Sequence, residues 1–470
     1  MKIKKFIYHF FFAFLIVCWF FSACKKDIPT TSPNAKLSFS ADTVLFDTVF
    51  TKIGSTTRRL LVYNDNPEPV NISNIKVAGG NNSQFHLTVD GFKTNQVLNK
   101  ELRAKDSMYI MVEVTINPQD GIFIIKDSIW FELNKNLQNI KLVAWGRDNY
   151  YHRKDIIKSD TTWSADKVHL IYNYVFVDSG ALTIPAGTAL YFHKNSAFYI
   201  GKNATLKVLG TCDDSVLFTG DRLESYYKNS PSQWTGLRFL PGSVNNEINF
   251  AIIRNAWVGI EVDSVPLNNN PGLILRNTII ENMGTAGLVG YTARIIGYNL
   301  LVDNCADYLV AGDFGGRYYF YQCTFANYNY TFQRNTPSLV FANTVYSAPG
   351  GPTLMDSLVV ELINCIVWGE RSDTSKDEFL IAQHPTGGPI VLNTLNNVFK
   401  TSSLALIDTS RNTVNIDPGF KNPRQFDYHL DSLSAVKYSG TDLLLPFIDK
   451  DHDCKIYNNP PSPGCYEWDW

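Results

Sequence analysis

Three charged residues that could act on a glycosidic bond stand at matching places in a repeated six-residue pattern. Arg254, Glu281 and Asp303 are each the fifth residue of a hexad, in FAIIRN, NTIIEN and NLLVDN respectively. If the hexads stack as neighbouring parallel strands, Glu281 and Asp303 lie about 5 Å apart, the carboxyl separation of retaining glycosidases. The alternative is a solvated ladder of opposite charges, where Arg254 neutralises Glu281 with little gain in stability. The hexads offer these residues as catalytic candidates and leave a purely structural face open.

The remaining reactive side chains form no known motif. The histidines are scattered without HxH or HExxH spacing and no CxxC occurs, so we predict neither a metal site nor a cofactor. Residues 449–453 read DKDHD, the start of a calcium loop. Cys454 and Pro460 then stand where such a loop needs Gly and Glu, so we expect a solvated turn.

A group of tyrosines follows the hexads that carry the acids. Its members are Tyr318, Tyr319, Tyr321, Tyr328 and Tyr330. Flat aromatic rings can stack on sugar rings, although tyrosines also cover the edges of strands with their amphipathic side chains. Both interpretations stay open at this point.

The hexad itself predicts the fold that must position these residues. It recurs as FAIIRN from Phe250, NTIIEN from Asn277, NLLVDN from Asn299, QCTFAN from Gln322, NTVYSA from Asn343, NCIVWG from Asn364 and NNVFKT from Asn396. Positions two and four are small or apolar and position five is mixed, which is the two-residue period of a strand. The distance along the chain from the start of one hexad to the start of the next is typical of a parallel β-helix, in which each turn adds one strand to each sheet.

The sixth position of four successive hexads is asparagine: Asn255, Asn282, Asn304 and Asn327. Stacked amides can donate to one another at the strand spacing, and asparagine tolerates the left-handed turn that ends a strand. We therefore predict a structural asparagine ladder of buried turn residues.

The N-terminal part has a different pattern. Between about Leu37 and Asp148, apolar and polar residues alternate in short runs such as 108–116, separated by turn sequences such as Asn64–Pro67. About seven short strands of this kind predict an antiparallel β-sandwich, and this stretch resembles an immunoglobulin-like module.

The first residues resemble a lipoprotein leader. Lys2, Lys4 and Lys5 precede a 16-residue apolar run (21 − 6 + 1) that is too short to span a membrane, and FSAC ends at Cys24 like a bacterial lipobox. The resemblance implies that Cys24 is lipidated, with a tether after it. An ordinary signal peptide or an uncleaved anchor are the alternatives.

The C-terminal two thirds resemble right-handed parallel β-helix lipoproteins of Bacteroidota type. The resemblance rests on LTI and AGT at residues 182–188, WTG at 234–236, DPGF at 417–420 and PGCYE at 463–467. It implies an outer-membrane protein held by acyl chains, at the cell surface rather than on the periplasmic face. Cys465 replaces the usual small residue of the closing element, which favours a disulfide between Cys454 and Cys465.

These patterns define the expected organisation. It comprises a signal peptide at 1–23, a tether at 24–36, the immunoglobulin-like sandwich at 37–148, a connector at 149–167, the right-handed parallel β-helix at 168–425 and a C-terminal cap at 426–470. The net charge of −2 and the lack of a basic stripe argue against nucleic acid as a partner.

Two classes of function remain. The first is a non-catalytic binding or scaffold surface for a polysaccharide or an outer-membrane protein partner. The second is a carbohydrate-active enzyme, a polysaccharide lyase or glycoside hydrolase, that uses carboxylates on the outer face of the β-helix. Fold resemblance alone does not choose between them, because one fold carries many functions.

Overall fold

A computed structural model describes residues 28–468 except 118–121, 264–269, 329, 345, 348–352, 355, 374–376, 404, 406, 444, 446 and 447. The predicted leader and Cys24 lie outside the described residues. Strands make up 53% of the chain and helices 2%, so the all-β prediction is confirmed. No helix of the described part has the length and hydropathy needed to cross a membrane. The chain divides into two compact units between Asp148 and Asn149.

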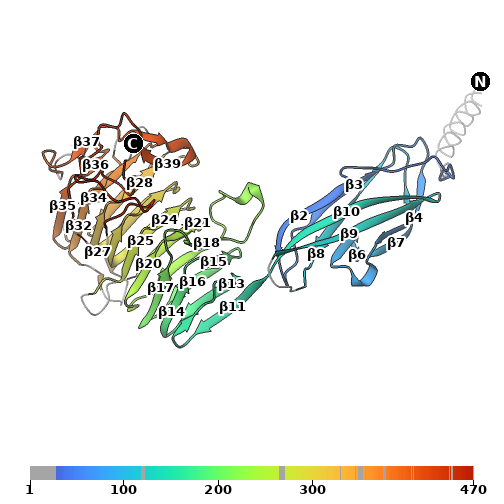
Figure 1. Cartoon of the computed structure of the whole chain (residues 1–470), viewed down its shortest axis with the longest axis horizontal. Coiled ribbons are helices and arrows are strands. Elements are labelled where there is room, and N and C mark those ends of the chain that lie inside the picture. Colours follow the sequence, from blue (N-terminus) through green and yellow to red (C-terminus); the bar gives the residue numbers. More distant parts are fainter. Residues whose placement is uncertain are drawn as a thin grey trace, which may run out of the picture. The chain divides into compact units, whose positions relative to one another are not determined.

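The N-terminal unit consists of two five-stranded sheets (Figure 1). The first contains β1 (Ser38–Phe39), β3 (Arg58–Tyr63), β8 (Ser107–Val114), β5 (Phe85–Val89) and β6 (Phe92–Thr94). The second contains β2 (Thr43–Phe50), β10 (Asn136–Arg147), β9 (Ile122–Leu133), β4 (Val70–Val77) and β7 (Gln96–Leu102). A short 3₁₀ helix, η1 (Gly80–Asn82), precedes β5. The inward residues of both sheets form one apolar core.

The pairing in this unit is antiparallel with one exception. β2 runs parallel to β10, with Thr43 opposite Lys141 and Phe50 opposite Arg147. An alternating pattern specifies which side chains face the core but not the direction of the neighbouring strand, so sequence periodicity could not distinguish the two directions.

The second unit is dominated by parallel strands, in which each strand pairs with the strand about three places further along the chain. The chain thus winds through three rows of strands, one row after another, and their inward side chains share one continuous core. Figure 1 shows successive strands of these rows side by side, from green at β14 and β17 to orange at β32 and β35.

We call the rows A, B and C. Row A consists of β16 (Ala197–Ile200), β19 (Gly236–Phe239), β22 (Val258–Asp263), the first halves of β25 (Ala286–Tyr298) and β27 (Tyr308–Tyr321), β29 (Leu339–Ala342) and β34 (Phe379–Ala382). Row B consists of β14 (Gly180–Pro185), β17 (Ala204–Leu209), β20 (Asn246–Asn249), β23 (Leu273–Arg276), the second halves of β25 and β27, β32 (Leu358–Ile363) and β35 (Ile390–Leu395). Row C consists of β15 (Ala189–Phe192), β18 (Val216–Gly220), β21 (Ala251–Arg254), β24 (Ile279–Glu281), β26 (Leu301–Asp303), β28 (Thr324–Asn327), β33 (Ile366–Gly369), β36 (Val398–Phe399) and β37 (Thr413–Val414).

The stretch expected to connect the two domains is instead the start of the parallel sheet. β11 (Asn149–Ile157) pairs in parallel with β13 (Val168–Val177), and β12 (Thr161–Thr162) pairs with β14. Most side chains of β11 are exposed or half-buried, so its sequence lacks the apolar alternation that would have revealed a strand.

One hexad also departs from the expected pattern. β28 pairs directly with β33, and the hexad from Asn343 is not in row C. Its β30 (Tyr346–Ser347) forms a short antiparallel hairpin with β31 (Thr353–Leu354). The hexad from Asn343 therefore resembles the repeat in sequence without forming a strand of row C.

The C-terminal segment, residues 418–468, contains the hairpin of β38 (Phe420–Asn422) and β39 (Asp427–Leu430). Two further 3₁₀ helices, η2 (Ser225–Tyr227) and η4 (Pro423–Gln425), lie in loops. The segment packs on the outer face of row C, where residues of both form a second apolar cluster.

Candidate functional site

Arg254, Glu281 and Asp303 are brought together as neighbours on row C. The register places Arg254 opposite Glu281 and Glu281 opposite Asp303 on three successive strands. Arg254 Nη1 lies 3.8 Å from Glu281 Oε1, and both side chains keep more than a quarter of their surface exposed. Arg254 and Glu281 therefore form an ion pair that solvent partly screens.

Asp303 has a different environment, because the C-terminal segment covers it. Only 1% of its surface is exposed, and neither carboxylate oxygen makes a hydrogen bond of normal geometry within the described residues. The apolar cluster around it joins Leu301, Ile366 and Trp368 of row C to Tyr428 and Leu430 of the segment. A polymer in solution has no open path to this carboxyl group.

Burial determines the charge of Asp303. Burial raises the pKa of Asp303 well above its usual range, the charge of Glu281 raises it further, and the nearby Tyr428 hydroxyl lowers it in part. Burial also raises the pKa of Glu281, against the lowering effect of Arg254. Burial and the charge of Glu281 thus both favour the neutral form of Asp303 inside an apolar cluster, and these neighbouring residues do not supply the open pair of carboxylates that glycoside hydrolysis needs.

The signal for this cover was present in the sequence. Position three of the hexad is apolar in six of the seven copies, as in Ile279, Leu301, Ile366 and Val398, so these strands carry apolar residues on the outer face as well as on the inner one. A strand that is apolar on both faces is buried on both faces. The charged residues at position five of the first three hexads, Arg254, Glu281 and Asp303, concealed this signal.

The predicted asparagine ladder has three linked members. Asn282 Nδ2 donates to Asn255 Oδ1 at 2.6 Å, and Asn304 Nδ2 donates to Asn282 Oδ1 at 3.0 Å. All three are buried and have positive φ. Asn327 is buried too, but it exchanges hydrogen bonds with the backbone of Cys305 instead of with Asn304.

A second set of amides, at the first hexad position, was missed. Asn277 donates to Asn249 and Asn299 donates to Asn277, at 3.0 and 2.9 Å. Further along the column the amides reach the C-terminal segment: Asn299 donates to the Lys450 carbonyl, Gln322 to Ser462, Asn364 to Thr441 and Asn396 to Ser439. The initial residue of the hexad could have revealed this set, because it is Asn or Gln in six of the seven copies.

The disulfide of the structure is not the expected one. Cys454 bonds to Cys212, and Cys465 is a free, buried thiol. The Cys465 amide donates to Thr324 Oγ1 at 3.0 Å, which fixes this residue in the cover over row C. The predicted Cys454–Cys465 pair is therefore wrong, because the fold brings Cys212, in the loop after β17, to the C-terminal segment.

The DKDHD sequence also serves this attachment. Asp451 is fully buried, and its carboxylate accepts the backbone amides of Lys455 and Glu467 at 2.7 and 2.9 Å. His429 stands between Asp427 and Asp453, with 2.6 and 2.9 Å contacts from its two ring nitrogens. These carboxylates raise the pKa of His429. Both ring nitrogens of His429 are therefore engaged by carboxylates within the C-terminal segment.

The five tyrosines do not make one platform. Tyr318 points into the core and its hydroxyl donates to the Gly290 carbonyl. Tyr319 and Tyr321 face outward from row B, whereas Tyr328 and Tyr330 stack on each other beside the C-terminal segment. Alternation along β27 puts Tyr318 on the opposite face from Tyr319 and Tyr321, as the two-residue period requires.

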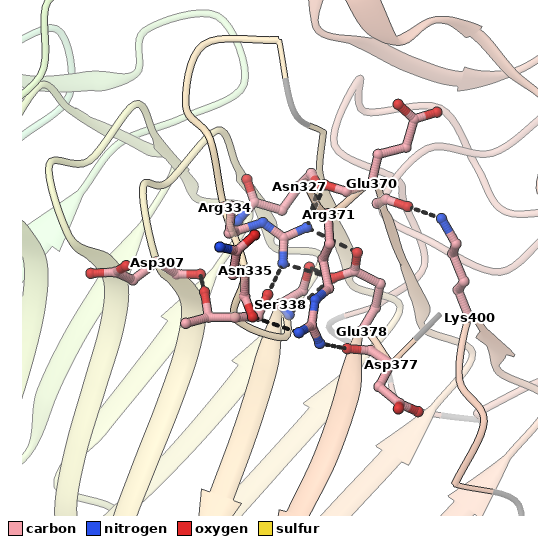
Figure 2. A network of polar contacts seen from close by, with 12 residues as sticks. Asp307, Asn327, Arg334, Asn335, Ser338, Glu370, Arg371, Asp377, Glu378 and Lys400 are labelled. Carbon is pink, nitrogen blue, oxygen red and sulfur yellow. Dashed lines mark hydrogen bonds and ion pairs between the residues drawn. The ribbon is translucent and has the colours of Figure 1, made fainter. Parts of the chain in front are cut away.

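A buried ion pair unnoticed in the sequence holds the loop between β28 and β29. Arg334 and Glu378 are 1% and 0% exposed in their side chains, and two 2.9 Å hydrogen bonds join them. Ser338 donates to the same carboxylate, and Arg334 donates to the carbonyls of Asn327 and Glu370 (Figure 2). Because the terminal nitrogens of Arg334 are fully engaged inside the protein, this pair is structural.

Two of the open, polar surfaces of the second unit carry clusters of charged side chains. A cleft of about 920 Å³ in the C-terminal segment is lined by charged side chains that include Lys421, His429 and Asp453. On the outer face of row A, Arg238 pairs with Glu261 at 3.3 Å and with Asp263 at 2.8 Å. Burial raises the pKa of Glu261, and Asp263 raises it further against the effect of Arg238.

Comparisons with known proteins leave the family open. No family model matches the chain, and no curated protein matches it. Among solved structures, the catalytic domain of a GH87 alpha-1,3-glucanase in complex with tetrasaccharides matches 72% of this chain and 80% of its own, with 10% identity and a TM-score of 0.20. A PapD-like domain of human CEP192 matches 27% of this chain and 96% of its own (10% identity, TM-score 0.18). A Porphyromonas gingivalis protein of unknown function matches 26% of this chain and 59% of its own (12% identity, TM-score 0.19). TM-scores of this size support no argument about function.

Proposed function

We propose that this chain is a lipid-anchored protein of the cell envelope whose second unit is a right-handed parallel β-helix that binds a glycan without cleaving it. The N-terminal unit is then an immunoglobulin-like spacer. The burial of Asp303 beneath the C-terminal segment supports the non-catalytic function most directly, because it removes the predicted pair of carboxylates from any substrate.

The anchor and the compartment rest on independent features. The lipobox-like FSAC ending at Cys24 supports acylation, which requires more than one acyl chain to hold a protein stably on a membrane. The Cys212–Cys454 disulfide supports an oxidising compartment such as the envelope, because structural disulfides are rare in reducing ones.

A binding panel with a turnover readout tests the proposal. The full-length protein in detergent is incubated with uncharged and uronic-acid polysaccharides. Retention of a glycan, without new reducing ends or unsaturated products, is the expected result. Turnover, or binding of an outer-membrane protein in place of every glycan, would contradict it.

A catalytic function is the second candidate, and the residues that could perform it lie on row A. Glu261 and Asp263 lie on the same outward face of β22 beside Arg238, and the raised pKa of Glu261 suits a general acid. If the panel reveals cleavage, Glu261→Gln should abolish it while Glu281→Gln leaves it unchanged. Cleavage that survives Glu261→Gln excludes this site.

A further inference from the structure

The outer face of row B carries a connected strip of polar and aromatic side chains. Seven successive strands, from β17 to β35, contribute one residue each. In order these residues, here called the row B strip, are Lys207, Glu247, Arg276, Tyr298, Tyr321, Glu361 and Asn393.

Each member of the strip contacts the next. Glu247 accepts from Lys207 at 3.4 Å and from Arg276 at 3.1 Å. The Arg276 guanidinium lies over the Tyr298 ring at 4.9 Å, and Tyr298 stacks on Tyr321 at 5.3 Å. Glu361 accepts from the Tyr321 hydroxyl at 2.5 Å and from Asn393 at 3.3 Å. The strip is therefore held in one arrangement before any ligand arrives.

The strip ends in a groove. The groove measures about 320 Å³ and is lined by Glu361, Ile363 and residues 392–395 on one side and by Asp408 and Arg411 on the other. Arg411 is exposed, and its guanidinium makes no side-chain hydrogen bond within the described residues. Asn393 uses its amide nitrogen toward Glu361, which leaves its carbonyl oxygen to accept from a ligand.

The charges of the strip and groove cancel. Lys207, Arg276 and Arg411 are balanced by Glu247, Glu361 and Asp408. Alternating donors and acceptors without net charge suit vicinal hydroxyl groups better than a polyanion, which would meet as many carboxylates as cations. The stacked rings occupy one another's faces, so recognition here depends on hydrogen bonds rather than on ring stacking.

The spacing of the strip suits a linear chain of sugars. Neighbouring strands lie ~4.8 Å apart, so six steps from β17 to β35 span about 29 Å. A sugar in an extended polysaccharide advances by a similar distance, so one sugar can lie over each strand, although the strip itself moves two residues along the strands at Arg276 and back again at Glu361.

We propose that the row B strip binds an uncharged, extended oligosaccharide, with about one sugar per strand and one end of the chain in the groove beside Arg411. This inference rests on the proposed glycan-binding function and identifies its surface and its class of ligand.

The test measures affinity by titration calorimetry on the full-length protein in detergent. The probes are uncharged oligosaccharides of two to six sugars, namely cello-, malto-, manno- and xylo-oligosaccharides, with oligogalacturonates as charged counterparts. For at least one uncharged series we expect the affinity to rise about tenfold or more from two sugars to six. Arg411→Ala and Asn393→Ala should each weaken binding of the hexasaccharide about five- to tenfold.

Two matched variants separate this surface from the rest of the molecule. Arg153→Ala removes an exposed arginine of β11, and Lys421→Ala alters the cleft of the C-terminal segment; both should leave the affinity unchanged. Glycan binding that is unchanged in Arg411→Ala and Asn393→Ala, or that prefers oligogalacturonates, overturns this inference alone. Absence of binding to every probe overturns the proposed function together with it.

Discussion

At the scale of single residues, the environment of a side chain decides its chemistry more than its place in a repeat does. Glu281 and Asp303 occupy the same hexad position on neighbouring strands, yet one faces an arginine at the surface and the other lies in an apolar cluster. Glu281 acts as a partner in an ion pair, whereas the surroundings of Asp303 favour its neutral form.

Asp303 should make stability depend on pH. Because the pKa of Asp303 is raised in the folded state, the folded protein holds a proton that the unfolded chain has released above pH ~4. The free energy of unfolding should therefore fall as the pH rises from that value to the folded-state pKa. Asp303→Asn should remove this slope and increase stability at neutral pH by about 1–3 kcal/mol.

Urea denaturation of the two proteins at several pH values between 4 and 8 provides the measurement. Asp178→Asn changes an exposed aspartate of the same unit and should leave the pH dependence as it is. A wild-type slope that Asp303→Asn does not alter would mean that this carboxyl group is ionised in the folded protein.

Asn304 should be important for both its amide and its backbone. Asn304→Leu removes the hydrogen bond to Asn282 and puts a branched residue at a φ of 48°, so it should lower stability by about 1–3 kcal/mol from the amide and ~1 kcal/mol more from the backbone. Glycine adopts a positive φ without strain, so Asn304→Gly should show only the loss of stability that comes from the amide. Equal melting temperatures for wild type and Asn304→Gly would contradict a role for the amide.

At the scale of elements, the attachment of the C-terminal segment to row C is the main feature. Apolar contacts, the amides of the first hexad column and one disulfide all contribute to it. The Arg334–Glu378 pair plays the same part for the loop that follows β28 (Figure 2).

The disulfide should stabilise this attachment. Cys454→Ser should lower the free energy of unfolding by about 2–5 kcal/mol, and Cys212→Ser should have the same effect. Because both substitutions remove one bond, the double variant should be no less stable than either single one. Peptide mapping without reduction should find Cys212 joined to Cys454, whereas a Cys454–Cys465 peptide would contradict the structure.

The buried ion pair should be costly to break. Glu378→Gln leaves Arg334 with an uncompensated charge in the interior, so we expect a loss of about 3–5 kcal/mol in thermal or denaturant unfolding. Glu113→Gln disrupts an exposed pair with Lys93 and should cost less than ~1 kcal/mol. Similar losses for both variants would show that the interior pair is solvated.

The sequence predicts the strands and their register better than it predicts which segments cover them. The hexad column from Arg254 to Asp303 is in the predicted register because apolar periodicity specifies which residues stack. The apolar third position of the hexads indicates that row C is covered, but it does not identify the covering segment, which lies more than 100 residues away from Asp303. The Cys212–Cys454 bond and the Arg334–Glu378 pair are equally non-local, and no local pattern encodes such partners.

At the scale of the whole molecule, the proposed lipid anchor is the feature that remains to be tested. Cys24→Ser should release the protein from the membrane fraction and remove the acyl mass from its N-terminal peptide, because the acyl chains supply the apolar area that holds it on the bilayer. Fractionation and peptide mass spectrometry measure both effects. A Cys24→Ser protein that stays with the membrane would favour an uncleaved anchor.

The cover on row C has a consequence for how the protein is assembled. Its residues follow all three rows in the chain, so during export every strand of row C emerges before the segment that shields it. Until then, Leu301, Ile366 and Trp368 are open to other apolar chains. Variants truncated before residue 418 should therefore aggregate or be degraded in the envelope even though their rows are intact.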